Sequence, residues 1–465
     1  MELHYRLACP SCGKIHDDAE DRFPLSCTEP HPPALLRALF DSPRFDVQPD
    51  LPGIFRYRCW LPVRRTLPEE ARPAVFPAGP LAERLGLKRL FLAVSGYWPE
   101  KGAYMETCSF KELEAVTILA RLLPRPLAGL LPRPLAGLLP RPLARLLPRP
   151  LAGLLPRPLA RLLPCRFPRA AGTLVVASAG NTGRAFLQYS CRTGVPVLVV
   201  VPEAALPGVW TTVARQPAAS LLAVKAPSDY ADAIETADRI AKLPGFFPEG
   251  GARNVARRDG LGTVLLSAVE ATGEIPRHYF QAVGSGTGAI GVWEANLRLI
   301  GDGRFGGRKT RLHLSQNEPF TILSDAWERR SRSLGELPEG EAKARIARLH
   351  SPVLSNRKPP YGLCGGLYDA LEDTDGAMYR VATAEALDAG RLFRDLEGCD
   401  LDPAAEVALA SLMQAVRSGA VKPEESVLLN LTGAGGKRVE REGRARPFEP
   451  DRLIAKGGDV ERLFG

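Results

Sequence analysis

The chain has 465 residues, a formal net charge of +9, and 45% hydrophobic against 24% charged residues. This composition is typical of a soluble globular protein, and the length is sufficient for two domains with separate cores. No run approaches the roughly 20 apolar residues of a transmembrane helix. Residues 1–10 show no signal-peptide pattern. We therefore expect a cytoplasmic protein with no membrane partner.

The positive charge is concentrated in one segment. Residues 124–163 contain five copies of the octapeptide Pro-Arg-Pro-Leu-Ala-(Gly or Arg)-Leu-Leu, with seven arginines and no acidic residue. Without these seven charges, the rest of the chain carries only +2 of the +9. Two prolines in every eight residues exclude a continuous α-helix. We interpret the repeat as a tolerated surface-loop expansion, because doubling a loop costs only about 0.6 kcal/mol. A membrane, partner or RNA tether is the alternative, and we expect no nucleic-acid partner.

The N-terminal segment contains a candidate metal site. Of nine cysteines, an odd number, only Cys9 and Cys12 are closely spaced, and Gly13 follows them. Cys-x-x-Cys-Gly is typical of a zinc-knuckle turn, in which two thiolates fill half of a tetrahedron. Cys27 is the candidate third ligand, with His31 or His16 as the fourth. No second Cys-x-x-Cys follows, so a structural zinc and a metal-free remnant of such a ribbon both stay open, and we favour the remnant.

Strands and helices alternate along most of the remaining chain. The pattern first predicts a short helix over 81–86, a strand over 90–95, and a helix from Lys111 to about Leu122. Further strands are predicted at 173–177, 195–201, 221–225, 278–283, 311–315 and 427–431, and helices at 183–191, 229–242, 289–300 and 404–418. This alternation predicts an α/β fold with a largely parallel sheet. A charged, helical excursion of unknown role lies within residues 327–354.

Lys111 is the candidate reactive residue. It follows Ser109 and Phe110 at the start of its predicted helix, with Leu113 just beyond. A lysine that attacks a carbonyl must be neutral, which requires a partly desolvated site, and apolar neighbours are consistent with this. A single lysine at a helix start is usually only solvated, so the interpretation depends on two glycine-rich loops.

The first loop is Gly284-Ser285-Gly286-Thr287-Gly288, between a predicted strand and helix. Alternating glycines allow backbone amides to approach a phosphate, two hydroxyls add donors, and the helix dipole favours an anion. The loop lacks both the Lys-Ser/Thr of a P-loop and the Gly-x-Gly-x-x-Gly spacing of dinucleotide sites. It therefore predicts a cofactor with a single phosphate, with a simple tight turn as the alternative.

The second loop, Ser178-Ala179-Gly180-Asn181-Thr182-Gly183, also joins a predicted strand to a predicted helix. Its amides could hold a substrate carboxylate, while the Asn181 amide bonds a ring hydroxyl. A last loop, residues 430–436, follows the final predicted strand and contributes the neutral hydroxyl of Thr432. Together with Lys111, the loops predict an enzyme that binds a phosphorylated aldehyde cofactor.

These motifs resemble those of a known enzyme family. The chain resembles pyridoxal-phosphate enzymes of the tryptophan-synthase-β fold (fold type II), in their threonine-synthase-like branch, and more closely the archaeal cysteate synthases. The resemblance covers nearly the whole chain except the repeat. Ser-Phe-Lys and Ser-x-Gly-Asn-Thr are specific to the superfamily, and Gly-Gly-Ala-Arg-Asn narrows it. The matching segments are 96–100, 107–111, 177–182, 249–260, 279–288 and 356–361.

The resemblance implies two domains, each with a twisted, mostly parallel sheet flanked by helices. Residues 1–40 would form a zinc-ribbon-like segment, and residues 41–95 with 226–465 the large domain that binds the cofactor phosphate. Residues 96–225 would form the small domain, with the repeat as an insertion. The family also makes a homo-oligomer the expected state.

The resemblance also implies a role for each motif. Lys111 would carry pyridoxal 5'-phosphate as a Schiff base and act as the general base. Asn181, Thr432 and the loop Gly284, Ser285, Gly286, Thr287 and Gly288 would bind the cofactor. Ser178, Ala179, Gly180 and Thr182 would bind the substrate. Thr432 would face the pyridine nitrogen, and a neutral hydroxyl there cannot keep that nitrogen protonated as a carboxylate would.

The implied reaction is a β-replacement that converts O-phospho-L-serine and sulfite to L-cysteate and phosphate, a step toward coenzyme M in methanogenic archaea. Because phosphate leaves and sulfite enters, the site needs positive charge, and we expect one or two of four arginines to supply it. The candidates are Arg184, Arg253, Arg257 and Arg258. Within the family, the alternative is a threonine synthase acting on O-phosphohomoserine with water. Outside it, the alternative is a basic RNA- or partner-binding protein that uses the repeat.

Overall fold

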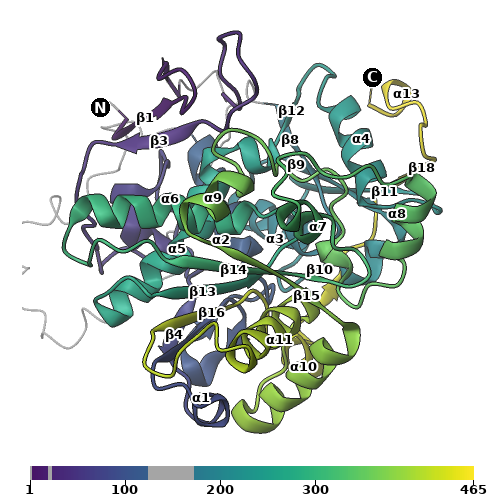
Figure 1. The fold of residues 1–465 in the computed structure, drawn as a ribbon. Helices are drawn as coiled ribbons and strands as arrows, with labels where there is room; N and C mark the ends of the chain where they lie inside the picture. Colours follow the sequence, from purple (N-terminus) through teal and green to yellow (C-terminus); the bar gives the residue numbers. More distant parts are fainter. Residues whose placement is uncertain (1–2, 19–23, 124–171, 465) are drawn as a thin grey trace, which may run out of the picture.

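The computed structural model describes residues 3–18, 24–123 and 172–464, and two parallel sheets dominate it (Figure 1). The predictions for the repeat at 124–163 lie outside these described residues. Within them, no helix is long and apolar enough to cross a membrane.

The larger sheet has six strands in the order β15-β14-β13-β16-β5-β4. All neighbours pair in parallel except the edge strand β4, which runs antiparallel to β5. The central strands consist almost entirely of buried residues, as expected for a parallel sheet covered on both faces. The bounds are β4 Ala74–Pro77, β5 Leu90–Val94, β13 His278–Ala282, β14 Arg311–Asn317, β15 Ala377–Val381 and β16 Val427–Leu431.

Helices cover both faces of this sheet (Figure 1). On one face, α11 (Pro403–Arg417) contacts the four strands β13, β14, β15 and β16, and α10 (Thr383–Glu397) packs against α11. On the other face lie α2 (Lys111–Leu122), α5 (Val255–Thr272) and α6 (Thr287–Asp302). The middle helix of these three, α5, is buried on every side from Val255 to Val269.

Two glycines allow α2, α5 and α6 to pack at close range. A Cβ on Gly260 of α5 would lie 2.5 Å from the carbonyl oxygen of Leu113 in α2. A Cβ on Gly291 of α6 would lie 2.1 Å from the carbonyl oxygen of Arg258 in α5. Any side chain at these positions would push the helices apart, so the two glycines fix where the first turn of α2, with Lys111, lies.

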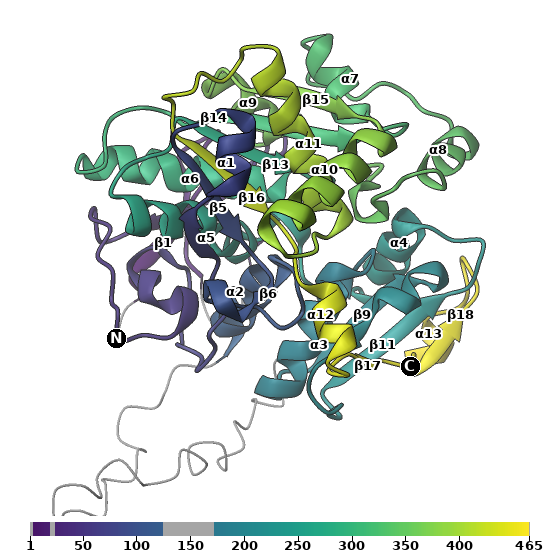
Figure 2. The ribbon, with the colours of Figure 1, turned by 90° about the horizontal axis from the view of Figure 1, so that it is seen from below.

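The smaller sheet has five strands, all parallel, in the order β12-β8-β9-β11-β18. Helix α3 (Asn181–Thr193) packs on one face of it and also contacts α2, while α4 (Tyr230–Ile240) contacts β8 and β9 (Figure 2). The helix α3 therefore lies between this sheet and the helices of the larger one. The bounds are β8 Thr173–Ala177, β9 Val197–Pro202, β11 Ala219–Val224, β12 Phe246–Pro248 and β18 Arg452–Ile454.

The N-terminal segment forms a small antiparallel sheet in the order β2-β1-β3, namely β1 (Tyr5–Ala8), β2 (Ile15–His16) and β3 (Arg37–Phe40). Its buried face packs against Val255, at the start of α5. The remaining elements are α1 Pro80–Leu85, β6 Tyr97–Trp98, β7 Ala103–Tyr104, β10 Trp210–Thr211, α7 Ile322–Glu328, α8 Glu339–Ile346, α9 Leu367–Asp373, α12 Gly436–Arg441, β17 Arg446–Pro447 and α13 Glu461–Phe464.

The predicted α/β class with two mostly parallel sheets is confirmed. The strands at 173–177 and 427–431 and the helix that starts at Lys111 have the predicted bounds. The helices α3 and α6 each begin two residues earlier than predicted, because residues assigned to the glycine-rich loops already form their first turns. The smaller sheet includes β12 and β18, which lie outside residues 96–225, and the domain boundaries stay a prediction.

Candidate active site

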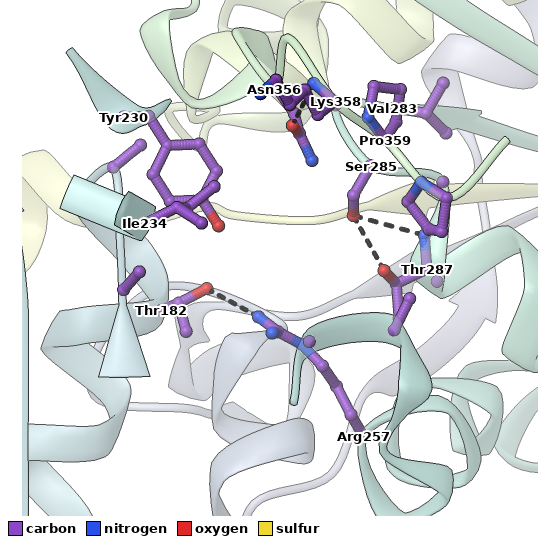
Figure 3. Close-up of a pocket in the computed structure, with 18 of the residues that line it drawn as sticks. Thr182, Tyr230, Ile234, Arg257, Val283, Ser285, Thr287, Asn356, Lys358 and Pro359 are labelled. Atoms are coloured by element: carbon purple, nitrogen blue, oxygen red, sulfur yellow. Dashed lines mark hydrogen bonds between the residues drawn. The ribbon is translucent and has the colours of Figure 1, made fainter. Parts of the chain in front are cut away.

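A cavity of about 970 Å³ opens at the carboxyl ends of strands β8, β13 and β16 (Figure 3). The loops that follow these three strands meet the first turn of α2 in its wall. Ligands of open parallel sheets bind at this edge, outside the carboxyl ends of the strands. In Figure 3, Thr182 and Tyr230 lie across the cavity from Ser285 and Lys358.

The cavity wall brings together most of the residues that the sequence singled out. Those that line it are Lys111, Ser178, Ala179, Gly180, Asn181, Thr182, Arg253, Arg257, Gly284, Ser285, Gly286, Thr287, Gly288 and Thr432. Of the residues predicted to bind the cofactor or the substrate, two do not line this cavity, Arg184 and Arg258.

Arg258 is fully buried on the other side of α5. It donates to Glu294 Oε2 at 3.0 Å and to the backbone carbonyl oxygens of Ala252 and Leu36. Arg184 borders a separate cavity of about 660 Å³, where its guanidinium stacks 4.4 Å from the ring centre of Trp210. The expectation that these two arginines face the substrate is therefore corrected: both face away from the Lys111 cavity.

The Lys111 amine lies among both apolar and charged groups. Its Nζ is 4.7 Å from the centre of the Phe110 ring and 3.2 Å from Glu114 Oε2, one turn along the same helix. Burial lowers the pKa of Lys111 below that of an exposed lysine, and nearby Arg257 lowers it further, although Glu114 opposes both. A neutral amine, the form that reacts with a carbonyl, is thus easier to reach here than at a solvated lysine.

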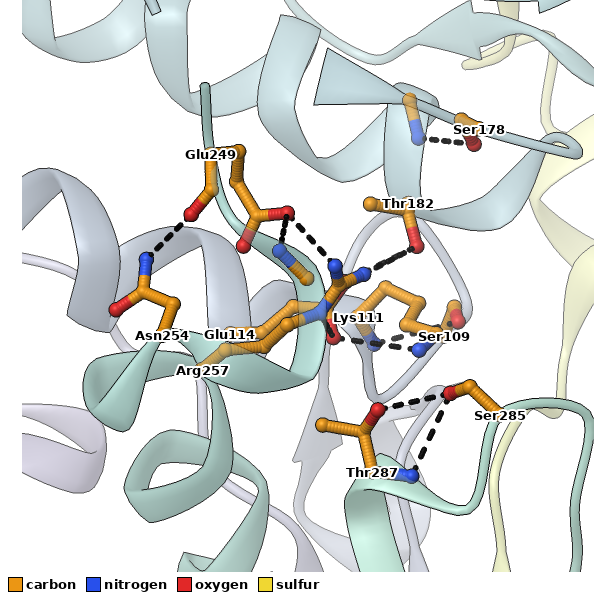
Figure 4. A network of polar contacts seen from close by, with 12 residues as sticks. Ser109, Lys111, Glu114, Ser178, Thr182, Glu249, Asn254, Arg257, Ser285 and Thr287 are labelled. Atoms are coloured by element: carbon orange, nitrogen blue, oxygen red, sulfur yellow. Dashed lines mark hydrogen bonds and ion pairs between the residues drawn. The ribbon is translucent and has the colours of Figure 1, made fainter. Parts of the chain in front are cut away.

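A network of buried charges surrounds this amine (Figure 4). Arg257 donates two hydrogen bonds to Glu114, from Nε to Oε2 at 2.9 Å and from Nη2 to Oε1 at 2.7 Å. It also donates from Nη1 to Glu249 Oε2 at 2.7 Å. The hydroxyl of Thr182 donates to Glu114 Oε1 at 3.0 Å and so ties the asparagine loop to the lysine helix.

The two carboxylates of this network differ in charge. Burial alone would raise the pKa of Glu114, but Arg257 and Lys111 outweigh it and hold that pKa below its usual value. Burial raises the pKa of Glu249 to about 7, because Arg257 offsets only part of the desolvation and the Glu114 charge opposes ionisation. Glu114 is therefore ionised at neutral pH, while Glu249 is about half protonated.

The loop from Gly284 to Gly288 forms the start of α6. Gly286 is the N-cap with φ of +76°, and its Cβ, if present, would lie 2.6 Å from the Leu367 side chain. The hydroxyls of Ser285 and Thr287 lie 2.8 Å apart at this helix end. Both hydroxyls and the amide end of a 16-residue helix thus face the cavity, which is the arrangement that binds phosphate groups.

The asparagine loop is closed by Ser178, whose Oγ accepts bonds from the amides of Gly180 at 2.9 Å and Gly183 at 2.7 Å. This closure presents Asn181 at the first position of α3 and in the cavity wall. In the loop that follows β16, the Thr432 backbone carbonyl accepts a hydrogen bond from the Phe110 amide at 2.9 Å. The last strand of the larger sheet is thereby fixed to the residue before Lys111.

These residues fit pyridoxal 5'-phosphate. The aldehyde needs a lysine of lowered pKa, which Lys111 provides, and the phosphate needs the anion cradle of Ser285, Thr287 and the α6 end. Thr432 places a neutral hydroxyl, and not a carboxylate, at the third loop. The donor set therefore matches the cofactor at each of its polar ends.

Four residues of this cavity wall were not predicted as site residues, namely Tyr230, Glu249, Asn356 and Lys358. Neither was Glu114, which lies behind the wall and accepts a bond from Lys111. Glu114 could have been found, because a helix that starts at Lys111 places residue i+3 on the same face. Lys358 belongs to a segment that carried the family resemblance, but its sequence pattern gives no role. Glu249 also begins a segment that carried the resemblance, again without a role, and Tyr230 carries no sequence signal. Only the tertiary fold brings these two residues to the cavity of the lysine.

At the N-terminus, the structure brings Cys9, Cys12 and Cys27 together with His31, and their ligand atoms all lie within 4.8 Å of one another. The other histidine considered, His16, has its Nε2 3.3 Å from the Cys27 sulfur. The predicted group of metal-ligand residues is thus assembled in space, with His31 completing it.

Comparisons with known proteins agree with this site. The family profile described as pyridoxal-phosphate dependent enzyme matches residues 149–433. The cysteate synthase of Methanosphaerula palustris is 46% identical over 100% of this chain and 97% of its own length. The cysteate synthases of Methanoregula boonei (45%, over 96% and 93%) and Methanoculleus marisnigri (43%, over 99% and 96%) are similarly close.

Solved structures support the fold. Maize serine racemase superposes with a TM-score of 0.52 at 12% identity, covering 80% of this chain and 91% of its own. Diaminopropionate ammonia lyase from Escherichia coli gives a TM-score of 0.52 at 14% identity, covering 80% and 87%. The predicted fold type II is confirmed, and the chain belongs to the cysteate synthase family of pyridoxal-phosphate dependent enzymes.

Proposed function

We propose that this protein converts O-phospho-L-serine and sulfite to L-cysteate and phosphate. The observation that carries the proposal is the identity of 41–46% with cysteate synthases over nearly the whole chain, combined with a lysine cavity suited to the cofactor. The similarity extends across both sheets and all three cavity loops, so it covers the complete site and not a single motif.

Pyridoxal 5'-phosphate, when bound, supplies an electron sink that stabilises negative charge at the α-carbon of an amino acid. The protein must then remove the α-proton, and the buried Lys111 Nζ is the group of lowered pKa in the cavity wall. Glu114, held by Arg257, lies 3.2 Å from this nitrogen and fixes its position. Lys111 therefore acts as the base that takes and returns the α-proton.

The asparagine loop positions the amino-acid substrate. Its backbone amides, at the start of α3, favour the α-carboxylate, and Thr182 is fixed by Glu114 on the same side as Lys111. The substrate Cα is thereby held between this loop and the lysine. Such fixed orientation is itself a large part of catalysis.

Positive charge for the phosphate and sulfite comes from Arg253 and Lys358. Both line the cavity and are exposed within it, and neither forms an ion pair with a carboxylate among the described residues. Arg257, by contrast, is already paired with the ionised Glu114 and also bonds Glu249. We therefore assign the recognition of the β-substituent to Arg253, with Lys358 as the second cation.

Glu249 can hold a proton for the departing group. Its Oε2 accepts bonds from Arg257 and from the Gly251 amide, while its buried Oε1 has no hydrogen-bond partner among the described residues. With a pKa of about 7, this carboxyl is protonated in part of the molecules at neutral pH. A proton on Oε1 would hydrogen-bond a phosphate oxygen as the bond to the β-carbon breaks.

The test is direct. The purified protein loaded with cofactor is incubated with phosphoserine and sulfite, and cysteate and phosphate are measured by chromatography and a phosphate assay. We expect the two products in equal amounts, and loss of both in Lys111→Ala. Lys88→Ala, at a lysine whose side chain is 69% exposed, should keep full activity.

Two results would contradict the proposal. Turnover of O-phosphohomoserine to threonine, with none of phosphoserine and sulfite, would make the protein a threonine synthase. A protein that loads no cofactor and binds RNA with a steep salt dependence would place its function in the basic repeat.

A further inference from the structure

The cluster of Cys9, Cys12, Cys27 and His31 has the dimensions of a tetrahedral metal site. The sulfurs of Cys12 and Cys27 lie 3.6 Å apart, and the Cys9 sulfur lies 3.3 Å from His31 Nε2. Tetrahedral zinc with Zn–S bonds of about 2.3 Å separates its sulfurs by roughly 3.8 Å, and a sulfur from a nitrogen by slightly less. The sulfur separation is also far beyond the roughly 2.0 Å of a disulfide bond.

The backbone preorganises the first pair of ligands. Between β1 and β2 the chain makes a tight turn, closed by bonds of 2.9 Å from the Gly13 amide to the Cys9 carbonyl and from the Cys9 amide to the Lys14 carbonyl. Gly13 has φ of +75°, which favours glycine. The turn brings Cys9 and Cys12 to one side, as a two-cysteine metal knuckle requires.

His31 is oriented as a ligand. Its Nδ1 lies 2.7 Å from the carbonyl oxygen of Pro32, and a carbonyl can only accept, so the ring proton is on Nδ1. The lone pair of Nε2 therefore points toward the cysteines. A metal-binding histidine commonly donates its other nitrogen to a backbone carbonyl in this way.

Cys27 has the surroundings of a thiolate. The Glu29 amide donates to its sulfur at 3.5 Å, and His16 Nε2 lies 3.3 Å from the same atom. These groups sit outside the four ligands and stabilise negative charge on the sulfur. Three thiolates and one imidazole form a closed set, which is typical of structural zinc and not of oxygen-preferring cations.

The same segment forms part of the active-site wall. Leu25, two residues before Cys27, lines the Lys111 cavity. It also lies against Gly250, where an added Cβ would come within 2.4 Å of the Leu25 Cδ2 atom. Gly250 follows Glu249 directly. The position of the Cys27 ligand thus determines how this part of the cavity is covered.

The N-terminal segment that carries the cluster is also connected to the lysine helix through Asp18. Asp18 accepts two bonds from Arg121 of α2, at 2.7 and 2.8 Å, and Arg121 donates to Asn254 Oδ1 at 2.9 Å. Cys9 itself belongs to a small buried core that includes Val255, the first residue of α5. A core of seven buried residues is too small to hold such a segment in place alone, and small segments of this kind depend on metals or disulfides.

We infer that Cys9, Cys12, Cys27 and His31 bind one structural Zn²⁺, and that this zinc holds Leu25 against the Glu249–Gly250 wall of the substrate cavity. The thiols lose their protons to solvent as the metal binds. The zinc takes no part in the reaction. Its removal loosens the cavity wall and weakens substrate binding, while Lys111 and the phosphate loop keep their positions.

The first test counts the metal, which does not depend on turnover. The full-length holoenzyme, purified without metal-affinity resin, is analysed by mass spectrometry of its elements, and we expect about one zinc per chain. Cys27→Ser should lower this to below about a tenth. Cys191→Ser, at a partly buried cysteine on α3, is the matched control and should keep its zinc.

Cobalt substitution tests the wild-type chain, so it does not depend on a variant that folds. Protein produced with Co²⁺ in place of Zn²⁺ should show the thiolate-to-cobalt and tetrahedral d–d absorption of a sulfur-rich site. Zinc below about a tenth per chain after addition of zinc sulfate, or a cobalt spectrum without thiolate bands, would overturn the metal site.

The link to the cavity is tested by chelation. Zinc-free enzyme should show a KM for phosphoserine raised about fivefold or more, equivalent to about 1 kcal/mol, with kcat little changed. Addition of zinc sulfate should restore the KM, and magnesium should not. If bound zinc is removed and the KM is unchanged, the zinc does not position the wall.

Discussion

Glu114 Oε2 lies 3.2 Å from Lys111 Nζ, and the same carboxylate accepts two bonds from Arg257. The charge of the reactive amine is therefore set by a competition. Burial and Arg257 lower the pKa of Lys111, while Glu114 raises it. Glu114 accepts four hydrogen bonds, two from Arg257 and one each from Lys111 and Thr182. Its negative charge is therefore shared with Arg257, so it positions the amine without being the partner of Lys111 alone.

Glu114→Gln should shift the titration of Lys111. Removing the negative charge leaves burial and Arg257 opposed only by the smaller effect of Glu249, so the pKa of Lys111 falls further and the neutral amine is present at lower pH. After the cofactor is removed and added back, the pH midpoint of the loading rate, followed by absorbance, should move to lower pH. The kcat should fall by up to about 100-fold, because the amine loses its fixed position.

Glu112→Gln is the matched control, since Glu112 is equally buried on the same helix but accepts a bond from Tyr189 at 2.6 Å instead of facing Lys111. It should leave the loading midpoint in place even if it lowers stability. A Glu114→Gln protein with an unshifted midpoint would show that Glu114 does not control the lysine.

Glu249 should make the folded protein less stable as the pH rises from 4.5 to 7. Its folded-state pKa of about 7 lies above the ordinary 4.5, so the folded state keeps a proton that the unfolded state has lost. Its contribution is complete below pH 4.5 and declines by at most about 1.4 kcal/mol per pH unit until pH 7. Glu249→Gln should remove this slope, measured as the free energy of unfolding in urea at several pH values.

Glu270→Gln serves as the control for this slope, because Glu270 pairs with Arg56 and Arg72 away from the cavity. It should change the stability without flattening its dependence on pH. A Glu249→Gln profile parallel to that of the wild type between pH 5 and 7 would mean that Glu249 is ionised throughout.

The parts of the site that the sequence predicted are those encoded locally. Lys111 and the two glycine-rich loops are recognisable because each motif combines the end of a strand, a turn and the start of a helix within a few residues. The four arginines were different. They are equally basic in sequence, but tertiary packing turns Arg258 toward Glu294 and stacks Arg184 on Trp210, away from the cavity.

The charge network could not be predicted for the same reason. Glu249 and Arg257 lie in one short segment, but their meeting with Glu114 depends on α5 packing against α2. Helix α5 itself has apolar and small residues on all its faces, so it lacks the one-sided pattern by which a surface helix is found. It was absent from the predicted elements although it is central to the fold.

Arg253→Met should weaken the binding of anionic substrates. Arg253 is exposed in the cavity and forms no ion pair with a carboxylate of the described chain, so its charge is available to the phosphate or sulfite. We expect KM for phosphoserine or sulfite to rise about tenfold, which corresponds to about 1.4 kcal/mol of binding. Steady-state kinetics with each substrate varied in turn will identify which anion it contacts.

Arg239→Met on α4 is the control for this loss of charge, because Arg239 does not line the cavity. Its kinetics should match those of the wild type. If Arg253→Met leaves both KM values unchanged, the cation that recognises the anions is Lys358 or Arg257 instead.

Gly260→Ala should both destabilise the protein and disturb Lys111. The added methyl group would lie 2.5 Å from the Leu113 carbonyl oxygen and 2.6 Å from Thr117 Oγ1, so α5 and α2 must separate. Overpacking of this kind costs about 1–3 kcal/mol, visible as a lower Tm, and the shift of α2 should reduce kcat. Gly301→Ala is the matched control, since a Cβ there meets nothing within 4 Å and alanine favours a helix. Equal Tm values for both variants would show that the close packing of α2 on α5 does not depend on Gly260.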